Sequence, residues 1–139
     1  MAHRSALVAV STAQLAAGLV GQLVALRRRR NYDVGFMRGS PEHVGRDSFW
    51  AGTAYSAPVT MMAAQAWATS RLRRGPDDGA RRFLGMLGVL MVPGYLMERH
   101  GRAHLRPGGL DPIETPVVLA GLGLAAAMGV LGHRDQARR

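Results

Sequence analysis

The residues of this chain best suited to chemistry are Glu98, His100 and His104, which lie close together in the sequence. The two histidines are separated by one helical turn, so on a continuous helix they share a face. Such a pair can ligate a metal ion or face a haem, but a complete site needs a third or fourth ligand. The remaining candidates fall on predicted loops and chain ends: His3, His43, His133, Glu42, Asp111 and Glu114.

Because those ligands are scattered, the sequence favours a plainer interpretation of the same cluster. Glu98 and Arg102 are also one turn apart, which is the spacing of a local ion pair. We expect the histidines to lie at a membrane interface, with Glu98 held by Arg102 or a loop arginine, and with no metal or cofactor bound. An intramembrane redox or hydrolytic enzyme built on these residues is the less favoured alternative.

A second set of polar residues lies inside otherwise apolar stretches. Its members are Ser11, Thr12, Gln14, Gln22, Thr53, Tyr55, Ser56, Thr60 and Gln65, and the candidates for binding a ligand are Gln14, Gln22, Tyr55, Thr60 and Gln65. They could line a pocket for a small lipophilic molecule between the first two predicted spans, or they could link helices to one another. The second interpretation is favoured, because polar side chains commonly join helices inside a membrane.

Two motifs suggest other chemistry, but the sequence around each of them argues against that interpretation. Gly121-x-Gly123-x-x-Ala126 matches a dinucleotide-binding fingerprint, but that fingerprint requires a preceding strand and this one lies within an apolar stretch. The carboxylates Asp111 and Glu114 are explained as caps of a helix start. The chain contains no cysteine, so disulfides and thiol chemistry are excluded.

Charge is segregated along the chain rather than mixed into it. All 18 basic residues are arginine, and they stand in short blocks between long uncharged stretches, giving a formal net charge of +9. A soluble amphipathic helix would place charges within each stretch at helical spacing. Arginines that adjoin apolar spans contact anionic lipid headgroups, so we do not expect nucleic-acid binding. The all-arginine usage with abundant alanine and glycine is typical of bacterial proteins of high genomic GC content.

Two predicted transmembrane spans are clear. Residues 5–26 contain no charge and are bounded by arginines, which is long enough to cross a hydrocarbon core and too long for an ordinary cleaved signal peptide. The last span begins at Asp111-Pro112-Ile113-Glu114, close to a capping box, and continues to Leu131.

The two middle spans carry irregularities. Residues 48–70 are uncharged and predict one span kinked at Pro58, preceded by a short surface helix starting at Ser40-Pro41. Residues 83–97 are short for a span and contain Pro93-Gly94, which should bend or break the helix. We expect helix to resume through Glu98 and the histidines until Pro107.

Four spans joined by short loops predict an all-α integral membrane protein, a four-helix up-and-down bundle formed by one domain over residues 1–139. Small residues recur every fourth position in two spans and predict close helix packing. They are Ala9, Ala13, Ala17, Gly21 and Ala25 in the first span and Gly121, Ala125 and Gly129 in the last. The 18 arginines divide equally between the two sides of such a bundle, so orientation is only weakly specified.

For function, the sequence favours a non-enzymatic accessory or scaffold component of the cell membrane. Its expected partners are the bilayer, anionic headgroups, and other membrane proteins or copies of itself. Binding or transport of a small lipophilic molecule is the alternative.

Overall fold

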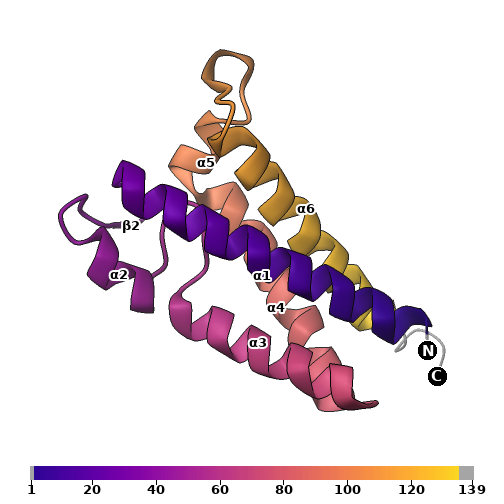
Figure 1. Cartoon of the computed structure of the whole chain (residues 1–139). Coiled ribbons are helices and arrows are strands. Elements are labelled where there is room, and N and C mark those ends of the chain that lie inside the picture. Colours follow the sequence, from indigo (N-terminus) through magenta and orange to yellow (C-terminus); the bar gives the residue numbers. More distant parts are fainter. Residues whose placement is uncertain (1, 135–139) are drawn as a thin grey trace.

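The computed structural model describes residues 2–134, and this part of the chain is mostly helical, in agreement with the predicted all-α class (Figure 1). Four long helices alternate with short elements. The long ones are α1 (Ala2–Arg28), α3 (Val59–Arg74), α4 (Asp78–Met97) and α6 (Glu114–His133). The short ones are α2 (Val44–Trp50), α5 (Arg99–Ala103), a 3₁₀ turn (Pro107–Gly109) and an unpredicted hairpin of β1 (Asp33–Val34) and β2 (Met37–Arg38).

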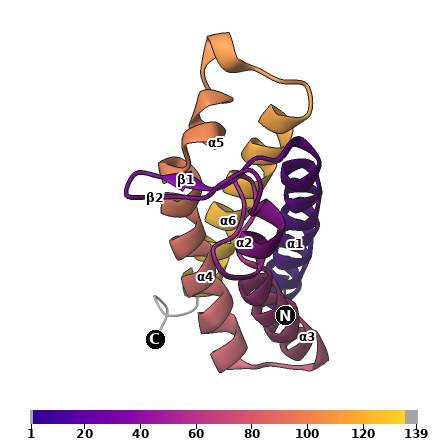
Figure 2. The same cartoon turned by 90° about the vertical axis from the view of Figure 1, so that its left-hand side faces the viewer.

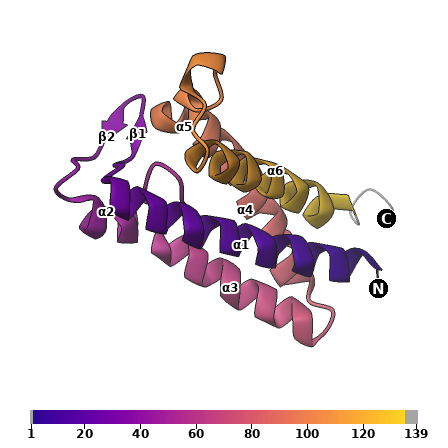
Figure 3. The ribbon, with the colours of Figure 1, turned by 45° about the horizontal axis from the view of Figure 1, so that its top comes forward.

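The long helices pack side by side in a closed ring. α4 packs on α6, α6 on α1, α1 on α3, and α3 on α4. The start of α1, the end of α6 and the α3–α4 connection lie at one end of the molecule (Figure 3). The hairpin, α5 and the loop before α6 lie toward the other end (Figure 2). We call the first the terminal end and the second the hairpin end.

The α4–α6 contact is the closest in the ring because glycines face each other across it. A Cβ atom at Gly88 would lie 2.5 Å from the backbone nitrogen of Gly129 and 2.6 Å from the carbonyl oxygen of Ala125. A Cβ at Gly132 would lie 2.3 Å from the Cα of Gly85. The predicted small-residue face of the last span is therefore a packing face, and Gly121, Ala125 and Gly129 are all buried.

The corresponding prediction for the first span was wrong over its first half. Ala9 and Ala13 are exposed, whereas Gly21 and Ala25 are buried. A strict four-residue repeat advances about 40° per step around a helix of 3.6 residues per turn, so it drifts away from any one partner. The buried stripe of α1 instead alternates steps of three and four residues: Leu7, Ser11, Gln14, Gly18, Gly21 and Ala25.

The second predicted span is not one helix. α2 ends at Trp50, and residues 51–58 form a loop before α3 begins at Val59. Gly52 has φ of +86°, and the Thr53 N–H donates to the Ser56 carbonyl oxygen at 3.1 Å, which closes a tight turn. Pro58 excludes helix from the residue before it, so it starts a helix here rather than kinking one. The preceding surface helix begins at Val44, not at Ser40-Pro41.

The third predicted span forms a longer helix than expected, and the segment that follows it differs from the prediction. α4 starts at Asp78, whose predecessor Asp77 caps it by accepting a hydrogen bond from the Ala80 N–H. The helix continues through Pro93, which is exposed, and stops at Met97. Glu98 has an extended backbone (φ −68°, ψ 120°) that separates α4 from α5. His100 and His104 therefore do not extend the third helix, contrary to prediction.

Two helices, α1 and α6, are long and apolar enough to cross a membrane. Only 28% and 33% of their most apolar stretches are buried within the structure. Most residues of these two stretches are therefore not buried by the rest of the described structure.

Candidate functional site

Glu114 lies at the centre of the most extensive polar cluster in the structure, although it stands at the start of an apolar helix. Asp111 caps α6, because its Oδ1 accepts hydrogen bonds of 2.8 Å from the N–H groups of Ile113 and Glu114. These N–H groups lower the pKa of Asp111 to about 2. With the cap supplied by Asp111, the side chain of Glu114 turns inward and is fully buried.

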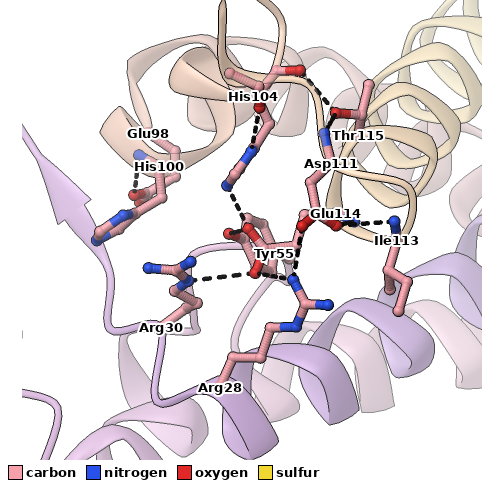
Figure 4. A network of polar contacts seen from close by, with 11 residues as sticks. Arg28, Arg30, Tyr55, Glu98, His100, His104, Asp111, Ile113, Glu114 and Thr115 are labelled. Carbon is pink, nitrogen blue, oxygen red and sulfur yellow. Dashed lines mark hydrogen bonds and ion pairs between the residues drawn. The ribbon is translucent and has the colours of Figure 1, made fainter.

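Three elements distant in sequence converge on this carboxylate (Figure 4). Oε1 accepts hydrogen bonds from Arg28 at the end of α1 (2.9 Å) and from Nε of Arg30 (3.3 Å). Oε2 accepts a hydrogen bond of 2.6 Å from the Tyr55 hydroxyl, which comes from the 51–58 loop. Arg28 also reaches Asp111 at 3.0 Å. The cluster thus fastens α1 and the 51–58 loop to the start of α6.

His104 joins the same carboxylate from the end of α5. Its Nε2 contacts Oε2 of Glu114, and its Nδ1 lies 2.7 Å from the carbonyl oxygen of Gly109. The ring of His104 thus bridges the Glu114 carboxylate and the turn at Gly109. Thr115 also donates to the His104 carbonyl oxygen at 2.9 Å. These contacts attach His104 to the start of α6, a role that the sequence did not predict.

The buried negative charge of Glu114 is balanced by groups within the cluster. The Glu114 carboxylate meets cationic or hydroxyl donors on both oxygens, as a buried carboxylate requires. Burial and the adjacent carboxylate raise the pKa of Tyr55, so this hydroxyl keeps its proton and acts as a donor. All these groups are occupied by one another, which fits a structural role.

Glu98 forms a separate centre beside the hairpin (Figure 4). Its side chain is 4% exposed and accepts hydrogen bonds from the N–H of Asp33 (3.0 Å to Oε2) and of His100 (3.3 Å to Oε1). No arginine pairs with it within residues 2–134, so the predicted ion pair with Arg102 or a loop arginine was wrong. Burial raises the pKa of Glu98 to about 7, because a buried carboxylate loses hydration.

A cavity of about 220 Å³ adjoins Glu98. Its walls come from the hairpin segment, the 51–58 loop, the start of α3 and the last turns of α4. Most of the lining is apolar, and none of the five polar residues predicted for a ligand pocket takes part in it. The cavity therefore lies at the hairpin end, not between the first two predicted spans.

Three of the predicted pocket residues bond to other groups inside the protein. Nε2 of Gln65 lies 2.9 Å from Oε1 of Gln14 and 3.2 Å from Oγ of Ser11, which links α3 to α1. Ser11 and Thr69 hydroxyls lie 2.7 Å apart and extend this link. Tyr55 belongs to the Glu114 cluster. These contacts are the helix-linking kind that the sequence favoured.

The other predicted site residues are more peripheral. Gln22 is half-buried on α1, and its Oε1 has no hydrogen-bond partner among the described residues. Thr60 is exposed in the first turn of α3 and donates to the Phe49 carbonyl oxygen at 3.3 Å. His100 is half-buried, and burial lowers its pKa. His100 and His104 thus lie in different surroundings and do not form one site.

Sequence reasoning missed the Glu114 cluster, although one signal was present. Asp111 alone suffices as the cap, so the Glu114 carboxylate at the start of an apolar helix is not needed for capping. An ionisable group in that position calls for a distant partner. The arginines that follow the first span were the available partners.

Among residues 2–134, no group of three histidine, aspartate or glutamate side chains is placed to hold a metal ion. No protein-family model matches the chain, and neither a curated protein nor a solved structure shows significant similarity to it.

Proposed function

We propose that this chain is a multi-pass membrane protein in which α1, α3, α4 and α6 cross the bilayer as an up-and-down bundle. The observation that carries the proposal is the character of the outward surface. Apolar side chains point outward from the middle of each long helix, and no charged residue lies among them. The large ones include Leu19, Val20 and Leu23 on α1, Trp67 on α3, Met86, Val89 and Leu90 on α4, and Leu119 and Val130 on α6.

The distribution of polar residues supports the same conclusion. At the level of these outward apolar residues, the buried interior contains Ser11, Gln14, Gln65 and Thr69. A soluble domain places apolar groups inside and polar groups outside, whereas a bilayer permits polar side chains only where they meet protein.

Arginines stand at both ends of the proposed spans. At the terminal end are Arg4, Arg71, Arg73, Arg74, Arg81, Arg82 and Arg134, and at the hairpin end are Arg27 to Arg30, Arg38, Arg46, Arg99, Arg102 and Arg106. The charged groups would contact anionic headgroups on the two surfaces of a cell membrane.

Within the membrane, we propose a non-enzymatic role as an accessory or scaffold component. The residues with most chemical capacity bond to one another across elements, as Glu114 does to Tyr55 and His104. Such ties fix the relative positions of helices. A rigid bundle with apolar outer faces suits packing against spans of other proteins or of a second copy.

The absence of cysteine from the chain makes a direct test possible. Single cysteines at Leu19, Leu119 and Leu110 would replace side chains that are 60%, 54% and 66% exposed. In vesicles, a membrane-impermeant charged maleimide should modify Leu110→Cys, in the loop before α6, when added to the side that this loop faces. It should leave Leu19→Cys and Leu119→Cys unmodified until the membrane is dissolved and the protein denatured.

Equal labelling of all three positions in native vesicles would refute the membrane proposal, as would extraction of the chain by alkaline carbonate. For the scaffold role, photoreactive residues at Val89 and Leu119 should yield discrete protein adducts in native membranes. Adducts with lipid alone would count against that role while leaving the membrane assignment intact.

A further inference from the structure

The cavity beside Glu98 combines a mostly apolar wall with one buried carboxylate. Met61, Leu90 and Met91 supply much of its wall, and methionine side chains adapt readily to apolar ligands. The hydroxyls of Thr53 and Ser56 also line it, but they lie 2.7 Å from each other and are engaged in that hydrogen bond.

The buried hydroxyl of Tyr95 has no hydrogen-bond partner among the described residues, but it lies against Gly121 of α6. Glu98 is the one carboxylate in the wall of this cavity. Its carboxylate accepts hydrogen bonds from only two N–H groups, although an ionised carboxylate offers about four acceptor positions. Arg38 and Arg99 pair with Asp33 at 3.6 and 3.8 Å rather than with Glu98. The positive charge of Arg102 acts on Glu98 only from a distance, without an ion pair. The cavity therefore presents unused acceptor capacity to whatever enters it.

We propose that this cavity binds a neutral lipophilic alcohol or phenol, whose apolar body lies among Met61, Leu90 and Met91 and whose hydroxyl donates a hydrogen bond to the Glu98 carboxylate. A donor is required because the site offers an acceptor. An anion would lie beside a buried carboxylate, and an ammonium group would leave at least one of its three N–H donors without an acceptor on Glu98.

The volume of the cavity limits the ligand to one ring and a short tail. A cavity of about 150 Å³ holds benzene, whereas drug-sized ligands occupy roughly 300–1,000 Å³. The value of about 220 Å³ here lies between these limits. The inference does not depend on the proposed membrane role, since cavity and carboxylate are features of the fold itself.

The test uses the purified full chain in detergent, at a pH above the Glu98 pKa of about 7 so that this carboxylate is ionised. Three probes of matched shape are compared: 4-hexylphenol, its methyl ether, and 4-hexylbenzylamine. Ligands that bind the folded state raise the thermal unfolding midpoint in a concentration-dependent manner. We expect 4-hexylphenol to act at a concentration at least tenfold lower than the ether or the amine. Equal potency of the phenol and its ether, or a more potent amine, would overturn the proposal.

Two glycines provide a matched pair of variants. Gly94 lines the cavity and Gly123 lies on the outer face of α6, and a Cβ atom at either position meets no atom within 4 Å. Gly94→Leu should fill the cavity and weaken the response to 4-hexylphenol at least tenfold, whereas Gly123→Leu should retain it. An unchanged response in Gly94→Leu would show that the phenol acts elsewhere, for example through the micelle, and would refute the site.

A third variant addresses the hydrogen bond itself. Glu98→Gln preserves the shape of the side chain but replaces a charged acceptor with a weaker neutral one. The preference for phenol over ether should fall from at least tenfold to less than threefold. Circular dichroism of each variant verifies that the helices remain, and a full preference in Glu98→Gln would rule out the assigned hydrogen bond.

Discussion

The hydroxyl of Tyr55 donates a hydrogen bond of 2.6 Å to Oε2 of Glu114, and the two residues are 59 positions apart in the sequence. Both side chains are fully buried. Tyr55 belongs to the loop that interrupts the second predicted span, where Gly52 and Pro58 also disfavour helix. The loop carries a donor to a carboxylate that would otherwise be buried with fewer partners.

Removing this donor tests how much the contact contributes. Tyr55→Phe should lower the free energy of unfolding by about 1.5–3 kcal/mol, the range for hydrogen bonds to charged groups. Thermal unfolding in detergent measures the effect. Tyr32→Phe is the matched control, because the half-buried Tyr32 hydroxyl has no hydrogen-bond partner among the described residues. An equal decrease in the free energy of unfolding in both variants would show that the hydrogen bond from Tyr55 to Glu114 does not stabilise the fold.

Removing the charge of Glu114 should lower the free energy of unfolding more than removing the charge of Asp111. Glu114→Gln leaves Arg28, Arg30 and His104 around a neutral group, and breaking a buried ion pair commonly costs about 3–5 kcal/mol. Asp111→Asn retains a side chain able to cap α6 and removes only a more exposed charge. We expect a clearly lower unfolding midpoint for Glu114→Gln than for Asp111→Asn, and the reverse order would contradict the central role of Glu114.

Titration of Glu98 should make the folded state less stable as pH rises. Its pKa is raised by burial from 4.5 to about 7, so between these values the folded state binds more protons than the unfolded state. The contribution of Glu98 to stability is therefore fully present below about pH 4.5 and is lost as pH rises to about 7. His100 acts oppositely, because burial lowers its pKa.

The variant Glu98→Gln separates the two effects. It removes the ionisable carboxyl and keeps His100, so the difference in unfolding midpoint between variant and parent isolates the titration of Glu98. This difference should shift in favour of the variant as pH rises from 5 to 8. A difference that is independent of pH would show that the Glu98 pKa is not raised.

Close packing of α4 on α6 predicts a contrast between two glycine substitutions. Gly88→Ala places a methyl group within 2.6 Å of backbone atoms of α6, which cannot move aside like a flexible side chain. Overpacking of this kind typically costs about 1–3 kcal/mol. Gly123→Ala enters open space and should be neutral or slightly stabilising, because alanine favours helix by up to about 1 kcal/mol. Similar unfolding midpoints in the two variants would refute the contact.

The sequence predicted those elements whose determinants are local. Uncharged runs between arginines located α1 and α6, and the capping residue Asp111 was recognised before the helix that it caps. The four-residue glycine and alanine repeat of α6 identified a packing face correctly because it is short enough not to drift around the helix.

Elements that depend on distant contacts could not be predicted in this way. The 51–58 loop looks apolar and continuous with its flanks, and its local helix breakers, Gly52 and Pro58, do not reveal that Tyr55 turns toward Glu114. The hairpin is similar, since the Asp33 N–H group finds its acceptor in Glu98, 65 positions later. Local pattern carries no information about such partners.

In the proposed membrane-spanning bundle, the interruption before α3 would affect the lipid around it. α3 has 16 residues and is therefore about 24 Å long, whereas a hydrocarbon core is about 30 Å thick. α2 packs against α3 and exposes Phe49 and Trp50, while Trp67 lies 5.5 Å beneath the Arg71 guanidinium toward the other end. In a bilayer, this flank of the molecule would create hydrophobic mismatch that the opposite α6 flank lacks, so lipids beside α3 would be compressed and shorter acyl chains would gather there.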